Sequence, residues 1–417
     1  MKHATTSLAL ILFQLTTTAS VVGFTSHRQS LVRSAALLPL VLLAYHQVFS
    51  VSEHIRNPVF RAFLGAASIF LVILYIDAAL LSRWAFETQG PTSSLGGLAP
   101  RRIESCDQRK DARVTSQASF RKRLRFGFSI ALQSRFPATP WAVPDLPPFS
   151  RHDPKYVPTR SSFLLRTTLK CVVYIFLLRT ISGLGNPDEN PVLFASDRAP
   201  LFRRLYYRGR GSITASELGT RAAAVLGYWT VQYVVIDLLY GLLALVAVGL
   251  GVTEVRGWVP AFGSVADARG VRLFWGRFYH QLIRQGCSSV AHYITYSVLR
   301  FRKERSSLAA RYVFTTLVFT VSGVFHALSD VSQGIPLRES GAMYFFGTQA
   351  LGIMLEDAFQ AIASRAGSSK QNVQGKLEGI LGRVCGHLWL LVWLAWTSPV
   401  WIYMSMQRDK GEPIIPF

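Results

Sequence analysis

The sequence predicts an all-α protein of the polytopic membrane class. Half of its 417 residues are hydrophobic, and only 16% are charged. Soluble domains carry about 25% charged residues. Several apolar runs approach or exceed the roughly 20 residues that a helix needs to cross a bilayer. Because backbone polar groups must be satisfied within the chain in the lipid core, such runs favour helices.

Apolar runs occur along most of the chain, and we expect about eight transmembrane helices, within a range of seven to nine. The first run also resembles the apolar part of a signal peptide, but it is long and lacks a clear small-residue cleavage site. The last run is either one tilted helix or two helices that meet at Pro399. The expected spans are 7–24, 31–50, 59–81, 162–184, 222–252, 308–331, 342–362 and 380–406.

The chain is strongly basic, with a net charge of +22 from 45 Lys and Arg against 23 Asp and Glu. The basic residues cluster in the loops, which indicates the positive-inside rule and attraction to anionic headgroups or to a phosphorylated substrate. No nucleic-acid-binding motif is visible, so we expect no nucleic acid partner. Loops 83–160 and 256–305 should therefore be cytosolic. Loop 186–221 would then be lumenal, although it carries six arginines, so the rule fails there or part of the loop re-enters the membrane.

The segment 274–284 has the pattern of an amphipathic helix at a bilayer surface. Aromatic and aliphatic residues recur at helical spacing on one side, and Arg277, His280, Gln281 and Arg284 fall on the other. The pattern is equally typical of an ordinary interfacial helix that happens to carry a histidine.

His326 lies inside the apolar run 308–331. An ionisable side chain at membrane depth is costly, so it faces a bundle interior or an aqueous cavity and marks a candidate functional site. Histidine is the usual general base near neutral pH. Asp330 follows one helical turn later, where it would hold the imidazole in one tautomer or lie at the membrane edge. The alternative is a histidine that hydrogen-bonds a neighbouring helix for packing.

The cysteines do not have the spacing of a zinc site or a disulfide framework, and we expect no bound metal. They are Cys106, Cys171, Cys287 and Cys385.

Several patches, in order, resemble the wax synthase-like branch of the membrane-bound O-acyltransferases, particularly its fungal terpenoid and meroterpenoid members. They are Thr-Pro-Trp at residues 139–141, Trp-Val-Pro-Ala-Phe-Gly-Ser at 258–264, Phe-Trp-Gly-Arg-Phe-Tyr-His-Gln at 274–281, the apolar segment 321–326 that ends in histidine, and 344–356. The third patch has tyrosine where the family usually has tryptophan, which keeps an aromatic interfacial residue. The likeness covers roughly residues 134–405.

The resemblance implies transfer of an acyl group from acyl-coenzyme A, most simply acetyl-coenzyme A, to the hydroxyl of a lipophilic alcohol. It maps the family's catalytic histidine onto His326 and an upstream polar position onto His280. Trp275, Arg277 and Arg284 are then candidates for acyl-coenzyme A binding, and Asp330 for orienting the imidazole. The acyl-coenzyme A is a co-substrate, so we expect no bound cofactor.

The apolar runs, the charged loops and the resemblance together predict a layout and a location for the chain. N-terminal transmembrane helices (1–82) would precede a basic cytosolic loop (83–160) and a wax synthase-like acyltransferase core (161–417). We expect an integral, multi-pass protein of the endoplasmic reticulum membrane.

Other functions remain open at this point. A long-chain wax ester synthase would share the fold, since pocket shape sets acyl length. A transporter would use Asp77, Asp237 and His326 as a proton path, but it predicts internal repeats that we do not find. A membrane terpene cyclase would need central acidic residues.

Overall fold

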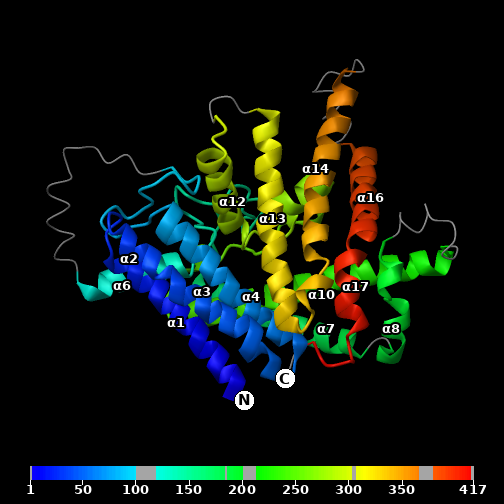
Figure 1. Cartoon of the computed structure of the whole chain (residues 1–417), viewed down its shortest axis with the longest axis horizontal. Helices are drawn as coiled ribbons and strands as arrows, with labels where there is room; N and C mark the ends of the chain where they lie inside the picture. The colour runs from blue at the N-terminus through cyan, green and yellow to red at the C-terminus, as the bar shows by residue number, and fades with distance from the viewer. Residues whose placement is uncertain are drawn as a thin grey trace. The chain divides into compact units, whose positions relative to one another are not determined.

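A computed structural model describes residues 2–99, 119–183, 186–200, 213–302, 307–365 and 379–414. Within these ranges the chain is helical, apart from loops and one isolated bridge between Ala85 and Gly90 (Figure 1). Cys106 and four arginines of loop 186–221 lie outside them: Arg203, Arg204, Arg208 and Arg210.

Seven helical segments among the described residues are long and apolar enough to cross a membrane, inside the expected range of seven to nine. Helix α14 (Ala342–Arg365) forms where the eighth span was expected, but it does not meet that length and composition standard. The seven are Ala4–Phe24, Ser30–His54, Pro58–Leu81, Arg160–Ser182, Ala215–Gly249, Leu308–Gln333 and Ile380–Thr397. The prediction of an all-α polytopic membrane protein is therefore confirmed.

The chain forms two compact units, residues 1–143 with 282–337 and residues 144–281 with 338–417. The three linear segments expected from the sequence stay a prediction. The helices of the first unit are α1 (Lys2–Phe24), α2 (Ser30–Ala35), α3 (Leu37–His46), η1 (Gln47–Val51), η2 (Ser52–His54), α4 (Pro58–Tyr75), η3 (Ile76–Leu81), α6 (Phe120–Ala131), α12 (Arg284–Tyr293), η9 (Ile294–Val298) and α13 (Leu308–Gln333).

The second unit contains α14 and further long helices that are given below. Its last two helices meet at Ser398 and Pro399, so the break at Pro399 is the alternative that the structure adopts. Its remaining helices are α7 (Arg160–Ser182), η4 (Pro187–Glu189), α8 (Asn190–Leu193), η5 (Ser196–Arg198), α10 (Ala215–Gly249), η6 (Val255–Gly257), η7 (Val265–Asp267), α11 (Val271–Leu273), η8 (Phe274–Phe278), α16 (Ile380–Thr397) and α17 (Pro399–Gln407), with η10 (Leu337–Glu339) at the boundary between the units.

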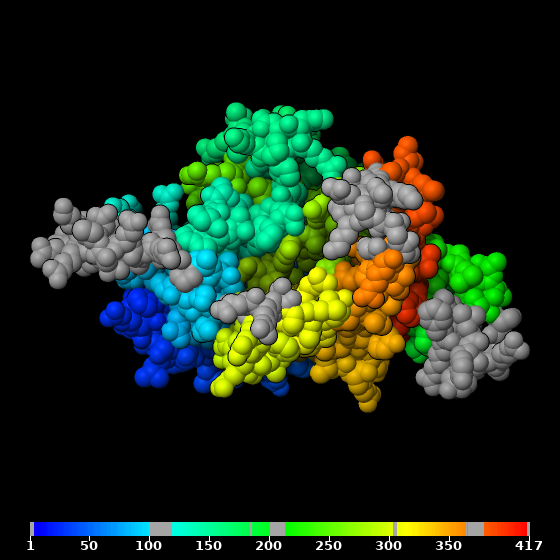
Figure 2. All heavy atoms as spheres, turned by 90° about the horizontal axis from the view of Figure 1, so that it is seen from above, coloured from blue at the N-terminus to red at the C-terminus, as the bar shows by residue number. Residues whose placement is uncertain are grey.

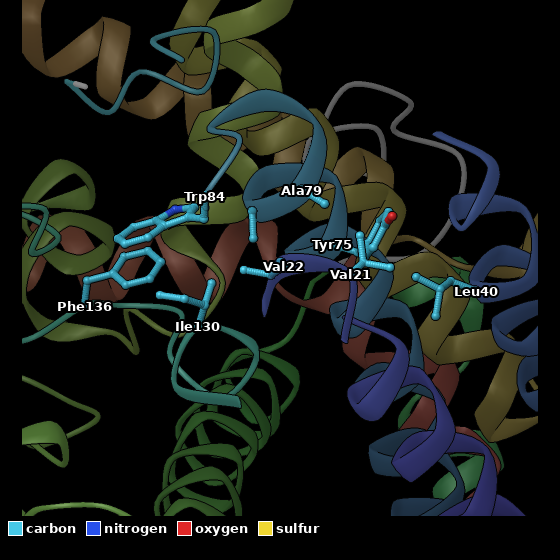
Figure 3. Packing of buried hydrophobic residues seen from close by; sticks show 9 residues of the cluster. Val21, Val22, Leu40, Tyr75, Ala79, Trp84, Ile130 and Phe136 are labelled. Atoms are coloured by element: carbon cyan, nitrogen blue, oxygen red, sulfur yellow. The ribbon is translucent and has the colours of Figure 1, made fainter. Parts of the chain in front are cut away.

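An apolar core joins the helices of the first unit. Trp84 stacks on Phe136 with ring centroids 4.8 Å apart, and Tyr75 donates a hydrogen bond to the carbonyl of Arg33 (Figure 3). Arg33 is only 1% exposed and donates to the carbonyls of Thr25, Ala79 and Trp84. This guanidinium therefore ties α2 to the end of η3 through neutral acceptors.

Helix α6 packs so closely on α1 that a side chain does not fit at Gly127. A Cβ there would lie 1.9 Å from the backbone oxygen of Ala19. We expect Gly127→Ala to lower the free energy of unfolding by about 1–3 kcal/mol, because a backbone must move to accept the methyl group. Thermal unfolding of the purified protein in detergent measures the change.

The matched control is Gly227→Ala on α10, where a Cβ meets nothing within 4 Å. That substitution should leave the midpoint unchanged or raise it, because alanine is the better helix former. Equal midpoints for the two variants would contradict the close packing of α1 and α6.

In the second unit, residues 144–159 are mostly exposed and form blue-green spheres on the surface in Figure 2. Arg151 of this segment pairs with Asp267, and Asp145 pairs with Arg277 at 3.6 Å. The segment therefore covers the region that precedes and includes the 274–281 motif.

Candidate active site

His326 lies on α13, and its ring orientation is fixed by its own helix. Its Nδ1 lies 2.7 Å from the carbonyl oxygen of Ser322, one turn earlier. A carbonyl oxygen only accepts, so Nδ1 carries the proton and Nε2 keeps the lone pair. The side chain is half-buried. The arrangement therefore leaves Nε2 as the proton acceptor of a half-buried imidazole.

The helix that carries His326 is held against α4. Phe325 packs into a cluster with Val48 and Ile69. Ser329 donates to the carbonyl of Ala62 at 3.3 Å, and Arg61 donates to the carbonyl of Gln333 at 3.0 Å. Contacts before and after His326 in the sequence thus fix the axial position and the rotation of α13 relative to α4.

Asp330 follows one turn after His326 and is 7% exposed. The acceptor that the structure gives to Nδ1 is the Ser322 carbonyl. An orienting role for Asp330 stays a proposal.

The predicted amphipathic helix over 274–284 is wrong in its length. The chain forms α11 and the π-helix η8, which ends at Phe278, and Tyr279 is extended with φ −70° and ψ 153°. Residues 279–283 are irregular, and α12 begins at Arg284. The two ends of the predicted helix therefore belong to different elements.

Tertiary contacts end this helix. The amide of Gly263 donates to the carbonyl of Phe278 at 2.8 Å, and a Cβ on Gly263 would lie 2.1 Å from the backbone oxygen of Arg277. The buried Gln281 side chain donates to the carbonyls of Trp275 at 3.1 Å and Tyr279 at 2.8 Å. These donors satisfy carbonyls at the helix end, which need partners wherever a helix stops.

Helix α14 holds the start and the middle of the same segment. The carboxylate of Glu356 accepts from the amides of Val271 at 2.6 Å and Arg272 at 3.1 Å. Two turns earlier, Oε1 of Gln349 accepts from the indole of Trp275 at 3.3 Å. A carboxylate at the first amides of a helix is favourable, because those amides lack partners inside the helix.

Aromatic rings surround the segment. Tyr279 lies 5.0 Å from Trp229, 5.2 Å from Phe274 and 5.4 Å from Trp275, between ring centroids. Burial, with a smaller contribution from Tyr228, raises the pKa of Tyr279 well above its ordinary value. The phenol therefore stays neutral, and the residue acts here as an aromatic packing group.

The remaining predicted site residues occupy different environments. His280 is half-buried, with its ring 4.8 Å from that of Tyr279 and 5.9 Å from that of Phe262. Arg277 is exposed and faces Asp145, in a surface pair of a kind worth about 0–1 kcal/mol. Arg284 is the first residue of α12 and is half-buried.

These residues divide between the two units. Trp275, Arg277 and His280 belong to the unit of residues 144–281 and 338–417. Arg284, His326 and Asp330 belong to the other. The first set lies on one segment of the chain. In the second set, Arg284 lies on α12, which contacts the helix α13 that carries His326 and Asp330.

The residues that the sequence did not reveal are those that hold the predicted site residues in place through hydrogen bonds. Glu356 and Asp357 stand out in the sequence as acids inside the apolar run 342–362, but that signal does not show which segment they contact. Gln349 and Ser322 carry no signal of their own, because a lone glutamine or a backbone carbonyl has no sequence pattern.

Comparison with known proteins identifies the family. A model of the membrane bound O-acyl transferase family matches residues 258–348, which include His280 and His326. The acetyltransferase fsoF of Humicola fuscoatra is 66% identical over 419 residues and covers 100% of both chains. The acetyltransferase aurG of Calcarisporium arbuscula is 33% identical over 95% of this chain and 92% of its own length. The acetyltransferase atnC of an Arthrinium species is 28% identical, with 91% and 83% covered.

The chain therefore belongs to the membrane bound O-acyl transferase family and is an O-acyltransferase, similar to the acetyltransferases named above. This membership confirms the resemblance drawn from the sequence and favours an acyltransferase over the transporter and cyclase alternatives. No solved structure matches the chain.

Proposed function

We propose that this protein transfers an acetyl group from acetyl-coenzyme A to a hydroxyl of a lipophilic secondary metabolite, such as a terpenoid or meroterpenoid, at the endoplasmic reticulum membrane. The observation that carries the proposal is His326, an imidazole on an apolar helix with Nδ1 bonded to Ser322 and Nε2 left as the acceptor. The names of the relatives, all acetyltransferases, support acetyl as the group transferred.

His326 acts as the general base. An alcohol is a poor nucleophile, and Nε2 removes its proton as the alcohol oxygen attacks the thioester carbonyl. The tetrahedral intermediate collapses with loss of the coenzyme A thiolate, which takes the proton back from the imidazolium. The products are the acetyl ester and free coenzyme A, and His326 returns to its starting tautomer. Asp330 orients the imidazole.

The other predicted site residues serve the thioester. His280 donates a hydrogen bond to the carbonyl oxygen as negative charge develops on it. Arg277 and Arg284 contact coenzyme A phosphates, which guanidinium groups bind well. Trp275 provides an aromatic surface for acyl-coenzyme A.

The wax ester synthase alternative differs in the length of the acyl chain and in its fatty alcohol acceptor, and a comparison of donors and acceptors tests it. Microsomes that contain the protein are incubated with acetyl-coenzyme A or palmitoyl-coenzyme A and a panel of hydroxylated terpenoids, meroterpenoids and fatty alcohols. Free coenzyme A and ester products are measured against microsomes without the protein. We expect acetyl esters of terpenoid alcohols. Palmitoyl esters of fatty alcohols would replace the proposal with the wax synthase alternative, and ester formation with neither donor would contradict both.

A further inference from the structure

A cavity of about 340 Å³ lies within the unit of residues 1–143 and 282–337, apart from the predicted site residues. Its walls come from His27 in the loop between α1 and α2, from α2 itself, from η3 and the chain that follows it, and from α12. Successive spans alternate direction, so the end of α1, the start of α2 and the end of η3 reach the same membrane surface. The cavity therefore lies at a membrane boundary, on the side where the basic loop 83–160 begins.

Basic side chains line part of the cavity. His27, Arg33 and Arg83 line it, together with the hydroxyl residues Ser30 and Ser34. The guanidinium of Arg33 bonds only to neutral oxygens among its described partners, so those bonds leave its charge uncompensated. Nε of Arg83 likewise donates to a neutral acceptor, the carbonyl of Leu80. These neutral acceptors satisfy hydrogen bonds and cancel no charge.

The local field at His27 is positive. Burial lowers the pKa of its imidazole, and Arg28, Arg33 and Arg83 lower it further, while Glu87 opposes them. The carboxylate of Glu87 is already paired with Arg123 at 3.2 Å. Nδ1 of His27 is also buried and has no hydrogen-bond partner among the described residues. A bound anion would relieve this positive field.

Apolar side chains also line the cavity. Ile76 and Val290 line it, and their chain neighbours Asp77 and Ser289 are joined by a hydrogen bond of 2.6 Å. Ser82 donates to the same Asp77 oxygen at 2.7 Å. These buried bonds hold η3 against α12, so the cavity is formed before any ligand binds.

We propose that this cavity binds a phosphate-bearing amphiphile at the membrane boundary, with the phosphate against His27, Arg33 and Arg83 and the apolar part along Ile76 and Val290. Arginine pairs strongly with phosphate oxygens, and basic pockets between transmembrane helices bind anionic headgroups. The phosphate belongs either to a lipid headgroup or to a coenzyme A thioester. The proposal does not depend on the function proposed above.

Binding of two probes to the purified full-length protein in detergent distinguishes these sources. Dihexanoylphosphatidic acid represents the lipid, and desulfo-coenzyme A represents the coenzyme without a transferable group. Dissociation constants are measured for wild type, for Arg83→Gln and for Arg83→Lys. We expect Arg83→Gln to weaken binding of one probe about tenfold, the effect of losing about 1.4 kcal/mol, and Arg83→Lys to recover part of it.

The matched control is Arg121→Gln on α6, which removes the same charge from an exposed residue that neither lines the cavity nor is among the charges that act on His27. A second variant, Ser34→Trp, fills the cavity from an exposed position and should weaken binding of the same probe. An effect confined to phosphatidic acid assigns the cavity to a lipid, and an effect on desulfo-coenzyme A assigns it to the coenzyme. If both probes bind Arg83→Gln and Ser34→Trp as tightly as Arg121→Gln, the proposal is wrong.

Discussion

His326→Ala should lower kcat by about 10²–10⁴-fold, the usual contribution of a positioned general base. The loss follows because no other group then takes the alcohol proton as the thioester is attacked. The fold should persist, since the described bond at Nδ1 is to its own helix, at Ser322, and α13 is held to α4 by other residues. The measurement is coenzyme A release by purified protein, with acetyl-coenzyme A and an accepted alcohol, beside a thermal unfolding curve.

The chain offers a matched control for this substitution. His387 also has Nδ1 bonded to the carbonyl one turn earlier, that of Arg383 at 2.7 Å, and its Nε2 lies 3.2 Å from the carbonyl oxygen of Val265. Both of its nitrogens face acceptors, so it presents no lone pair to a substrate. We expect His387→Ala to keep kcat within a factor of about three of wild type, well below the effect of a lost catalytic base. Equal losses in the two variants, or none in His326→Ala, would remove His326 as the base.

The helical spans were predictable because composition alone determines them. A run of apolar residues as long as 308–331 is long enough to cross a bilayer, and a helix is the structure that satisfies its backbone hydrogen bonds there. The structure accordingly places α13 at Leu308–Gln333, within two residues of the expected bounds. His326 was predictable for the same reason, because an ionisable side chain in such a run is costly unless it faces a protein interior or a cavity.

The segment 274–284 shows where this reasoning fails. Its apolar residues do recur at helical spacing, yet the helix stops at Phe278. The cause lies in Gly263 and Gln281, whose donors reach the carbonyls of Phe278, Trp275 and Tyr279. A contact between residues 15 positions apart in the chain leaves no trace in a local periodicity, and tertiary contacts override local propensity.

The supports of the segment were not predictable because their partners are distant in sequence. Val271 and Glu356 are separated by 85 positions, and Trp275 and Gln349 by 74. Only the fold shows that one helix, α14, holds both the start and the middle of this segment. This arrangement makes α14 the element that positions Trp275 and, through the following residues, the chain that carries His280.

Glu356→Ala should therefore lower activity without touching a reacting atom. The substitution leaves the amides of Val271 and Arg272 and the indole of Trp389 without their acceptor, so the start of α11 shifts. A displacement of about 1 Å at a catalytic segment can cost about 10²-fold in rate. We expect kcat/KM for acetyl-coenzyme A to fall by about 10–100-fold, and Glu356→Gln, which keeps one carbonyl acceptor, to recover part of the loss.

Asp357→Ala separates positioning from general stability. Asp357 pairs with Arg272 at 2.7 Å, and the Arg272 side chain is 43% exposed, so the pair contributes little, about 0–1 kcal/mol. This neighbouring variant removes the same charge from the same helix and should leave kcat/KM within about threefold of wild type, in line with that small contribution. If Glu356→Ala lowers the unfolding midpoint while kcat/KM matches that of Asp357→Ala, then Glu356 stabilises the fold and has no part in positioning the motif.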